Sequence, residues 1–157
     1  MQAYEIPATA TAQIERPLLQ LGSTGEAVKE LQTLLIWRDT YIGAIDGLFS
    51  VLVKNAVIAY QHRVFLLKDG IVGPLTWDAL FAGAPVNIPI LSQGSRGKMV
   101  FTLQHLLTLT GDYRGGIDGE FGWLTRAAVQ AFQRRSGLVA DGIVSDRTWY
   151  FLSQVPH

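Results

Sequence analysis

The sequence repeats itself after 72 residues, and this repeat limits the folds open to the chain. Residues 19–80 set against residues 91–152 agree at 29 of 62 positions, with no gap in either copy. An agreement of that size does not arise by chance, so the chain contains two copies of one structural unit. Each copy is about 65 residues long, which allows a small core but only marginal stability for a unit that stands alone.

The ends of the repeat predict where the units begin and end. We expect a first unit at residues 18–82, a linker at residues 83–89 and a second unit at residues 90–153. The linker contains two prolines, which favour a short and fairly stiff connection. Residues 1–17 belong to neither copy and are predicted to form an N-terminal tail.

Apolar residues recur at intervals of three and four, which is typical of helices that bury one face. Three such segments occur in each copy. The positions expected in the core are Val28, Leu31, Leu34 and Leu35 on the first helix, Leu52, Ala56, Val57 and Tyr60 on the second, and Thr76, Trp77 and Leu80 on the third, each with its counterpart 72 residues later. The predicted fold is therefore all-α, with two tandem three-helix units.

Residues suited to helix ends stand at the borders of these segments. Ser23 and Glu26 have the spacing of a capping box for the first helix, and Ser50 is suited to cap the second. Pro74 is suited to the first position of the third helix, where a missing N–H removes no hydrogen bond. Gly137 is suited to a left-handed stop after the second helix of the second unit.

Charge and composition exclude several classes of function. Thirteen Lys and Arg residues balance thirteen Asp and Glu residues, without a basic run, so no nucleic-acid partner is expected. No apolar stretch approaches the roughly 20 residues that cross a bilayer, and we expect neither a membrane span nor a signal peptide in the chain as given. Cysteine is absent, which removes disulfides, thiolate nucleophiles and cysteine-bound zinc.

Four aspartates directly precede glycine, which raises the question of an acid–base pair. Glycosidases use paired carboxylates, but such a pair needs one acid with a raised pKa. An Asp-Gly pair also tightens a turn, through an aspartate hydrogen bond to the backbone and a positive φ at glycine. We therefore expect Asp46, Asp69, Asp118 and Asp141 to form turns, and we predict no catalytic residue, no metal site and no cofactor.

Four motifs follow one another in each copy, and their order resembles the peptidoglycan-binding domain 1 family. They are G-S-x-G-x-x-V-x-x-L-Q-x-x-L, Y-x-x-x-I-D-G-x-F-G, A-V-x-x-F-Q and D-G-x-V-G-x-x-T-W. The resemblance covers residues 18–81 and 90–153. The first copy departs from the pattern at Ser50 and Val53, and the second at Ser145.

The resemblance implies a small three-helix module that holds a partner domain on bacterial cell wall and has no chemistry of its own. The implied ligand is peptidoglycan or muropeptides, and the implied protein partner is a cell-wall hydrolase. The implied location is the cell envelope, either periplasmic or extracellular. The predicted function is therefore non-catalytic binding of peptidoglycan by a targeting or scaffolding protein, not an enzyme.

The same resemblance places the expected ligand groove beside the loop at residues 115–122 and the start of the next helix. Tyr41 and Tyr113 precede their loops, where a hydroxyl can anchor either a backbone turn or a ligand. Arginine suits the carboxylates of a stem peptide, and an exposed Trp123 suits a sugar face or an interface. The predicted ligand-binding residues are Tyr113, Arg114, Asp118, Trp123 and Arg126 in the second unit, with Tyr41 and Asp46 in the first.

An alternative function comes from the differences between the copies. The second helix of the first unit has apolar residues where the second unit has larger or polar ones. These residues are Val51, Val53, Ile58 and Val64. They predict an apolar helix face that packs against the second unit or a second chain, since such a face on a small module usually marks a contact. The alternative is therefore a protein–protein interaction module, with self-association through this face.

Overall fold

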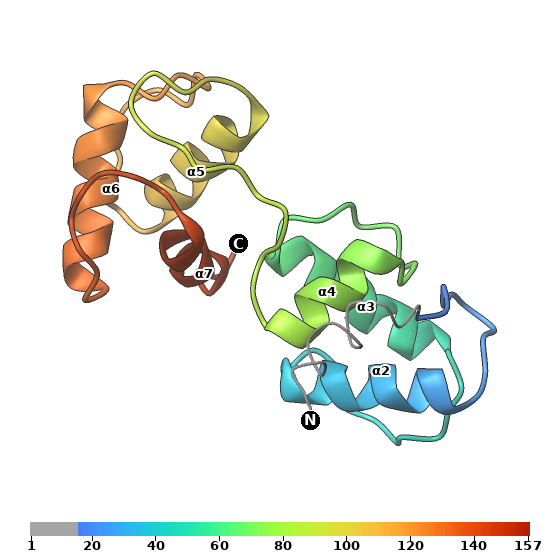
Figure 1. The fold of residues 1–157 in the computed structure, drawn as a ribbon. Coiled ribbons are helices and arrows are strands. Elements are labelled where there is room, and N and C mark those ends of the chain that lie inside the picture. The colour runs from blue at the N-terminus through green and yellow to red at the C-terminus, as the bar shows by residue number, and fades with distance from the viewer. Residues whose placement is uncertain (1–15) are drawn as a thin grey trace, which may run out of the picture. The chain divides into compact units, whose positions relative to one another are not determined.

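The computed structural model describes residues 16–157 and contains six helices in this range. They are α2 (Glu26–Trp37), α3 (Val51–Arg63), α4 (Pro74–Ala82), α5 (Lys98–Leu109), α6 (Trp123–Arg135) and α7 (Asp146–Ser153) (Figure 1). Within the same residues, extended pairing is limited to isolated bridges. The all-α prediction is confirmed. The predicted tail at residues 1–17 lies outside the described residues except for its last two.

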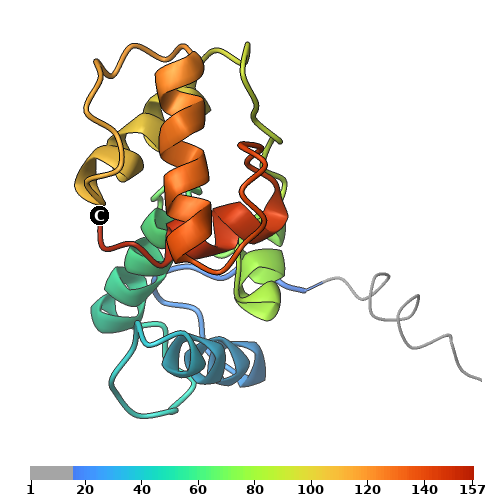
Figure 2. The same cartoon turned by 90° about the vertical axis from the view of Figure 1, so that its left-hand side faces the viewer.

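The chain divides into two compact units of three helices each. Among the described residues, the first unit comprises residues 16–62 and 66–83, and the second comprises residues 63–65 and 84–157. Within each unit, long loops join successive helices, as Figure 1 and Figure 2 show from two directions. The three helices per unit are those that the apolar spacing predicts.

The predicted core positions are buried, with one exception in each unit. Leu52 is 55% exposed and its counterpart Leu124 is 46% exposed, so the prediction is wrong for these two leucines. The next residue takes the inward position instead, since Val53 and Thr125 are buried. Position 53 lies three residues before Ala56, on the same helix face, whereas the residue before it points about 100° away.

Several helix ends form as the sequence predicts. The Ser50 hydroxyl accepts a hydrogen bond from the backbone N–H of Val53 (3.3 Å), which caps the start of α3. Pro74 is the first residue of α4. Gly137 follows the end of α6 with a φ of 76°, a left-handed conformation that favours glycine.

The predicted capping box at α2 does not form. The residue that caps α2 is Gly25, with a φ of 116° that side-chain-bearing residues rarely adopt, and no side chain bonds to the first turn. Ser23 therefore lies two residues before the capping position. Its hydroxyl instead accepts a hydrogen bond from the backbone N–H of Gln20 (3.0 Å), so Ser23 stabilises the preceding loop rather than the helix.

The third helix of each unit holds the segment that precedes the first helix. In the first unit, the indole N–H of Trp77 donates to the backbone carbonyl of Pro17 (2.9 Å). Leu19 and Val72 exchange two backbone hydrogen bonds nearby, at 3.1 and 2.8 Å. The second unit repeats these contacts between Trp149 and Pro89 and between Leu91 and Val144. A large buried aromatic residue therefore closes each unit without leaving its polar atom unpaired.

Four buried glutamines hold the loops onto the helices, and each forms a clamp together with one Asp-Gly turn. Gln32, Gln61, Gln104 and Gln133 are each at most 1% exposed, and each lies on an apolar helix face opposite one Asp-Gly pair. In every case the side-chain amide donates to the aspartate Oδ1 and to a backbone carbonyl, while its oxygen accepts from the glycine N–H. The contacts lie between 2.9 and 3.3 Å.

The glutamine on α5 has the largest set of partners. Gln104 Nε2 lies 3.0 Å from Asp118 Oδ1, from the Glu120 carbonyl and from the Thr125 hydroxyl, and its Oε1 accepts from the Gly119 N–H (2.9 Å). The Gly119 N–H and the Thr125 hydroxyl would lack a partner and water if the amide were removed, because both residues are buried. Unsatisfied buried polar groups cost about 1–3 kcal/mol each.

We therefore predict that Gln104→Leu lowers the free energy of unfolding of the second unit by about 3 kcal/mol. Urea unfolding with hydrogen exchange at the amides of α5, α6 and α7 measures this change. The control is Gln130→Leu, because the half-buried Gln130 has one side-chain hydrogen bond to residues 16–157, of 3.4 Å to the Ala140 carbonyl. That control should stay within about 0.5 kcal/mol. Equal effects in both variants would contradict a structural role for the clamp.

Candidate functional site

The two loop tyrosines anchor backbone turns. Tyr113 is 5% exposed, and its hydroxyl donates to the Gly116 carbonyl (2.7 Å) while it lies 3.3 Å from Gln104 Nε2. Tyr41 is equally buried, and its hydroxyl donates to the Ala44 carbonyl (2.8 Å). Both hydroxyls are therefore held by the protein, and little of either ring is open to a ligand.

Each tyrosine ring also requires the glycine two residues later. A Cβ at Gly115 would lie 2.7 Å from the Tyr113 hydroxyl, and one at Gly43 would lie 2.6 Å from that of Tyr41. Real Cβ atoms essentially never come this close, so only glycine fits beside the ring. The shared Tyr-x-Gly pattern is thereby explained by the shape of the loop.

All four turn aspartates behave as predicted. The Oδ1 atoms of Asp46, Asp69, Asp118 and Asp141 each accept the backbone N–H two residues later, at 2.9 to 3.0 Å. These bonds favour the charged carboxylate. The N–H of Glu120 and the amide of Gln104 hold the pKa of Asp118 below its ordinary value of 3.8. The amide of Gln32 and the N–H of Leu48 do the same for the pKa of Asp46. A general acid needs the opposite shift.

Two of the predicted ligand residues are exposed near the 115–122 loop. Trp123 is the first residue of α6 and is 70% exposed, and Arg114 is also exposed. Neither Arg114 nor Arg126 forms an ion pair within residues 16–157. These three side chains therefore present an aromatic face and two positive charges to solvent.

Arg126 lies three residues after Trp123 on α6, and its side chain extends toward a second turn. Its aliphatic part crosses the Asp141-Gly142 turn, where a Cβ on Gly142 would lie 2.8 Å from Arg126 Cγ. In the first unit Lys54 crosses Gly70 in the same way, at 2.9 Å from its Cγ. The structure therefore divides the predicted set, with Trp123 at the start of α6 and Arg126 over the turn before α7.

The apolar face predicted on α3 does not exist as a continuous surface. Val53 is fully buried on the inward face of α3, so it cannot belong to an outer apolar surface, and Val64 lies beyond the end of the helix and is 2% exposed. Ile58 is half-buried, and its Cδ1 would lie 3.4 Å from a Cβ on Gly70 of the same unit. Only Val51 remains widely exposed, at 60%.

The buried position of Val53 has a simple cause. Its counterpart Thr125 is also buried, and the Thr125 hydroxyl lies 3.0 Å from Gln104 Nε2. Valine has the same shape without the hydroxyl, so Gln32 in the first unit has one partner fewer. The exchange of Val for Thr therefore changes the clamp inside the unit and leaves the surface unaltered.

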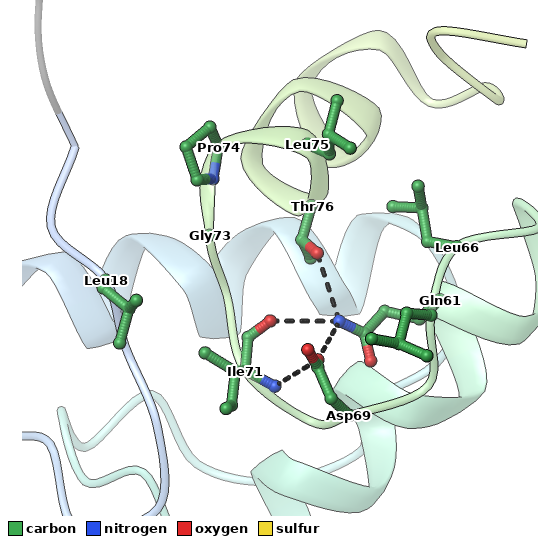
Figure 3. Close-up of a pocket in the computed structure, with 10 residues that line it drawn as sticks. Leu18, Gln61, Leu66, Asp69, Ile71, Gly73, Pro74, Leu75 and Thr76 are labelled. Carbon is green, nitrogen blue, oxygen red and sulfur yellow. Dashed lines mark hydrogen bonds between the residues drawn. The ribbon is translucent and has the colours of Figure 1, made fainter.

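A pocket of about 440 Å³ lies in the first unit, at a place that sequence reasoning missed. Figure 3 shows it between the end of α3, the loop that carries Asp69 and the start of α4. Its walls are mostly apolar, and its polar residues are those of the Gln61 clamp. The lining residues are Leu18, Gln61, Leu66, Leu67, Asp69, Ile71, Gly73, Pro74, Leu75 and Thr76. One sequence signal was present, since three of these positions in a row differ between the copies.

The four clamp glutamines also went unrecognised in the sequence, although a signal was available. A polar residue stands at the same place on an apolar helix face in both copies, in L-Q on the first helix and in Y-Q or F-Q on the second. A buried amide needs partners, and the Asp-Gly turns were the candidates.

The fold and its loops define a class, namely a tandem pair of three-helix modules whose loops are clamped by buried glutamines. The sequence profile of a family described as a putative peptidoglycan binding domain matches the chain twice, at residues 24–80 and 96–152. The two matches cover more than two thirds of the chain. The chain therefore belongs to the peptidoglycan-binding domain family, and it holds two copies of the domain.

Relatives of known name carry similar segments. The chain is 35% identical to an N-acetylmuramoyl-L-alanine amidase of Mycobacterium tuberculosis, over 86% of this chain and 38% of that protein. It is 31% identical to a probable N-acetylmuramoyl-L-alanine amidase of Bacillus licheniformis, over 83% of this chain and 43% of that protein. The chain thus spans less than half the length of these relatives. Among solved structures, the N-terminal domain of SleB matches 45% of this chain and 96% of that chain, with 31% identity and a TM-score of 0.43.

No helix within residues 16–157 has the length and apolar character needed to cross a bilayer. No three His, Cys, Asp or Glu side chains in that range converge in a way that would hold a metal ion.

The turn hydrogen bonds predict how the second loop responds to acid. Asp118 has a lower pKa in the folded chain than in the unfolded one, so its stabilising effect is complete above about pH 3.8 and falls as the pH drops through the folded pKa. Carboxyl ¹³C chemical shifts should therefore titrate below 3.8 for Asp46 and Asp118. The same aspartates in urea-unfolded chain are the control. A folded midpoint at or above 3.8 would contradict the observed bonding.

Proposed function

We propose that the chain binds bacterial peptidoglycan without catalysing a reaction, and that it targets or scaffolds proteins at the cell wall. The observation that carries the proposal is the presence of two complete copies of the peptidoglycan-binding domain. A location in the cell envelope, periplasmic or extracellular, is part of the same proposal. A cell-wall hydrolase is the proposed protein partner, in keeping with the amidase relatives.

The chemistry of the described residues supports binding over catalysis. The four turn aspartates each use Oδ1 to accept two N–H donors, and the two whose pKa is shifted are shifted downward. Glycoside hydrolysis needs a carboxylic acid that keeps its proton near neutral pH. Turn formation needs only an acceptor oxygen, and these side chains supply one at the same place in both copies.

In this proposal the exposed side chains of the second unit contact the ligand. Trp123 offers its ring to a sugar face or to lactyl and alanyl methyl groups, which pack well on aromatic surfaces. Arg114 and Arg126 offer guanidinium groups that can pair with the carboxylates of a stem peptide. Tyr113 and Asp118 act indirectly by fixing the loop beside Arg114 and Trp123, and Tyr41 and Asp46 fix the equivalent loop of the first unit.

Co-sedimentation with purified sacculi tests the proposal. We expect the full chain to pellet with sacculi, and Trp123→Ala to weaken this binding about tenfold because a stacking surface is lost. Val51→Ala is the matched control, since Val51 occupies the same position in the first unit and is similarly exposed. Arg114→Ala and Arg126→Ala should also bind less while the unfolding curve stays unchanged. A wild-type chain that remains in the supernatant would refute peptidoglycan binding.

A zymogram separates the non-catalytic proposal from an enzymatic one. The chain should leave embedded peptidoglycan intact at a concentration at which a cell-wall amidase clears it. A clear band from the purified chain, lost on heat denaturation, would overturn the non-catalytic part of the proposal and leave the binding part standing.

A further inference from the structure

The pocket of the first unit contains one charged side chain with an unused oxygen. Asp69 Oδ1 accepts from Gln61 Nε2 (3.0 Å) and from the Ile71 N–H (2.9 Å), which fixes the carboxylate in the pocket wall (Figure 3). Asp69 Oδ2 has no partner in residues 16–157. The turn therefore fixes the orientation of the Asp69 carboxylate through Oδ1 and leaves Oδ2 available to accept a hydrogen bond from a ligand.

Apart from Asp69, Gln61 and Thr76, the residues that line the pocket are apolar. Six aliphatic side chains form most of the wall, and Asp69 is the single ionisable lining residue. The aliphatic residues are Leu18, Leu66, Leu67, Ile71, Pro74 and Leu75. A carboxylate ligand would be repelled by Asp69. A neutral group with one N–H donor and a small apolar end fits both features.

The internal repeat shows which part of this wall is special to the first unit. Seven of the ten lining positions have an identical or closely similar residue 72 positions later. The other three are consecutive and lie at the start of the third helix. Gly73, Pro74 and Leu75 are replaced by Ser145, Asp146 and Arg147. The second unit therefore keeps the clamp and the aspartate but has two charged residues where the first has an apolar wall.

We infer that the first-unit pocket binds a methyl-bearing secondary amide of peptidoglycan, with the methyl group against Pro74 and Leu75 and the amide N–H donated to Asp69 Oδ2. The inference rests on the proposed function, because it names the chemical group that this unit takes from the cell wall. Two parts of peptidoglycan contain the group: the N-acetyl substituents of the glycan and the alanyl residues of the stem peptide. The volume of about 440 Å³ lies within the range of roughly 300–1,000 Å³ that is usual for small-ligand sites.

The two units then bind different groups. Asp146 and Arg147 are both exposed in α7, so the corresponding surface of the second unit is polar and charged. A methyl amide gains little by contact with such a surface, because burying it would strip water from the charges. The first unit binds a neutral amide, and the second unit contributes the aromatic and cationic side chains around Trp123.

A titration of the ¹⁵N-labelled full chain tests the pocket directly. The probes are tri-N-acetylchitotriose, fully deacetylated chitotriose and a synthetic alanine-containing stem peptide. We expect saturable shifts of the amides of Ile71, Leu75 and Thr76 with the acetylated sugar or with the peptide, and none with the deacetylated sugar. Shifts with the sugar assign the N-acetyl group, and shifts with the peptide assign the alanyl group. No shift at these amides with either probe would overturn the inference.

Variants drawn from the repeat give the matched controls. The double variant Pro74→Asp with Leu75→Arg gives the first unit the wall of the second, and should weaken probe binding at least about tenfold. The single variant Asp69→Asn keeps the Oδ1 acceptor for the turn but replaces Oδ2 with a donor, and should weaken binding similarly while the unfolding curve is retained. Arg147→Leu in the second unit should leave probe binding at the first-unit pocket unchanged. Unchanged affinity in the double variant would overturn the inference.

Co-sedimentation of the same proteins separates the two levels of the proposal. A wild-type chain that pellets with sacculi but shows no probe shifts refutes the amide pocket alone. A wild-type chain that fails to pellet refutes the proposed function, whatever the probes show. A wild-type chain that pellets, with sacculus binding reduced in the Pro74→Asp, Leu75→Arg variant, supports both.

Discussion

The buried glutamine amide is the interaction on which each unit depends. A unit of about 65 residues has three helices and long loops, and the loops carry backbone polar groups that must find partners where they meet the core. A primary amide supplies two N–H donors and a carbonyl acceptor from one side chain. Paired with an Asp-Gly turn, it satisfies the aspartate, the glycine N–H and a loop carbonyl together. Two such clamps per unit replace the hydrogen bonds that a sheet would otherwise supply.

The clamps and the loop tyrosines form a frame that is the same in both units. The differences between the units therefore lie at exposed positions. Tyr41 and Tyr113, the four clamp glutamines and the four turn aspartates have equivalent contacts after a shift of 72 residues. The exposed positions change: Ile42 becomes Arg114 and Val51 becomes Trp123. A duplicated domain whose frame is fixed and whose exposed side chains vary can bind two parts of one polymer, and simultaneous contact by linked modules strengthens binding without any new contact.

The sequence predicted most of the fold but less of the site, for physical reasons. Helix periodicity and turn chemistry are local, so the helices, the Ser50 cap and the Asp-Gly turns could be inferred from neighbouring residues. The failures concern longer-range contacts. The sequence alone predicts an exposed Val53. Its counterpart Thr125 contacts the side-chain amide of Gln104, which lies on another helix, and this contact cannot be seen in the local pattern. The contact of the Arg126 side chain with Gly142, sixteen positions later in sequence, is likewise not visible in the local pattern. The pocket required knowing that Leu18 and Leu75 lie in one wall.

The three consecutive differences at the start of the third helix are not required by the fold. Proline suits the first position of a helix because its missing N–H would be unpaired there, and aspartate suits the same position because a negative charge stabilises a helix N-terminus. Pro74 and Asp146 are therefore equally good starts for α4 and α7. Leu75 and Arg147 are both exposed, so neither is needed in a core. Since the helix can begin with either set of residues, the fold does not determine which residues line this wall. The chemistry of the bound ligand can therefore determine them.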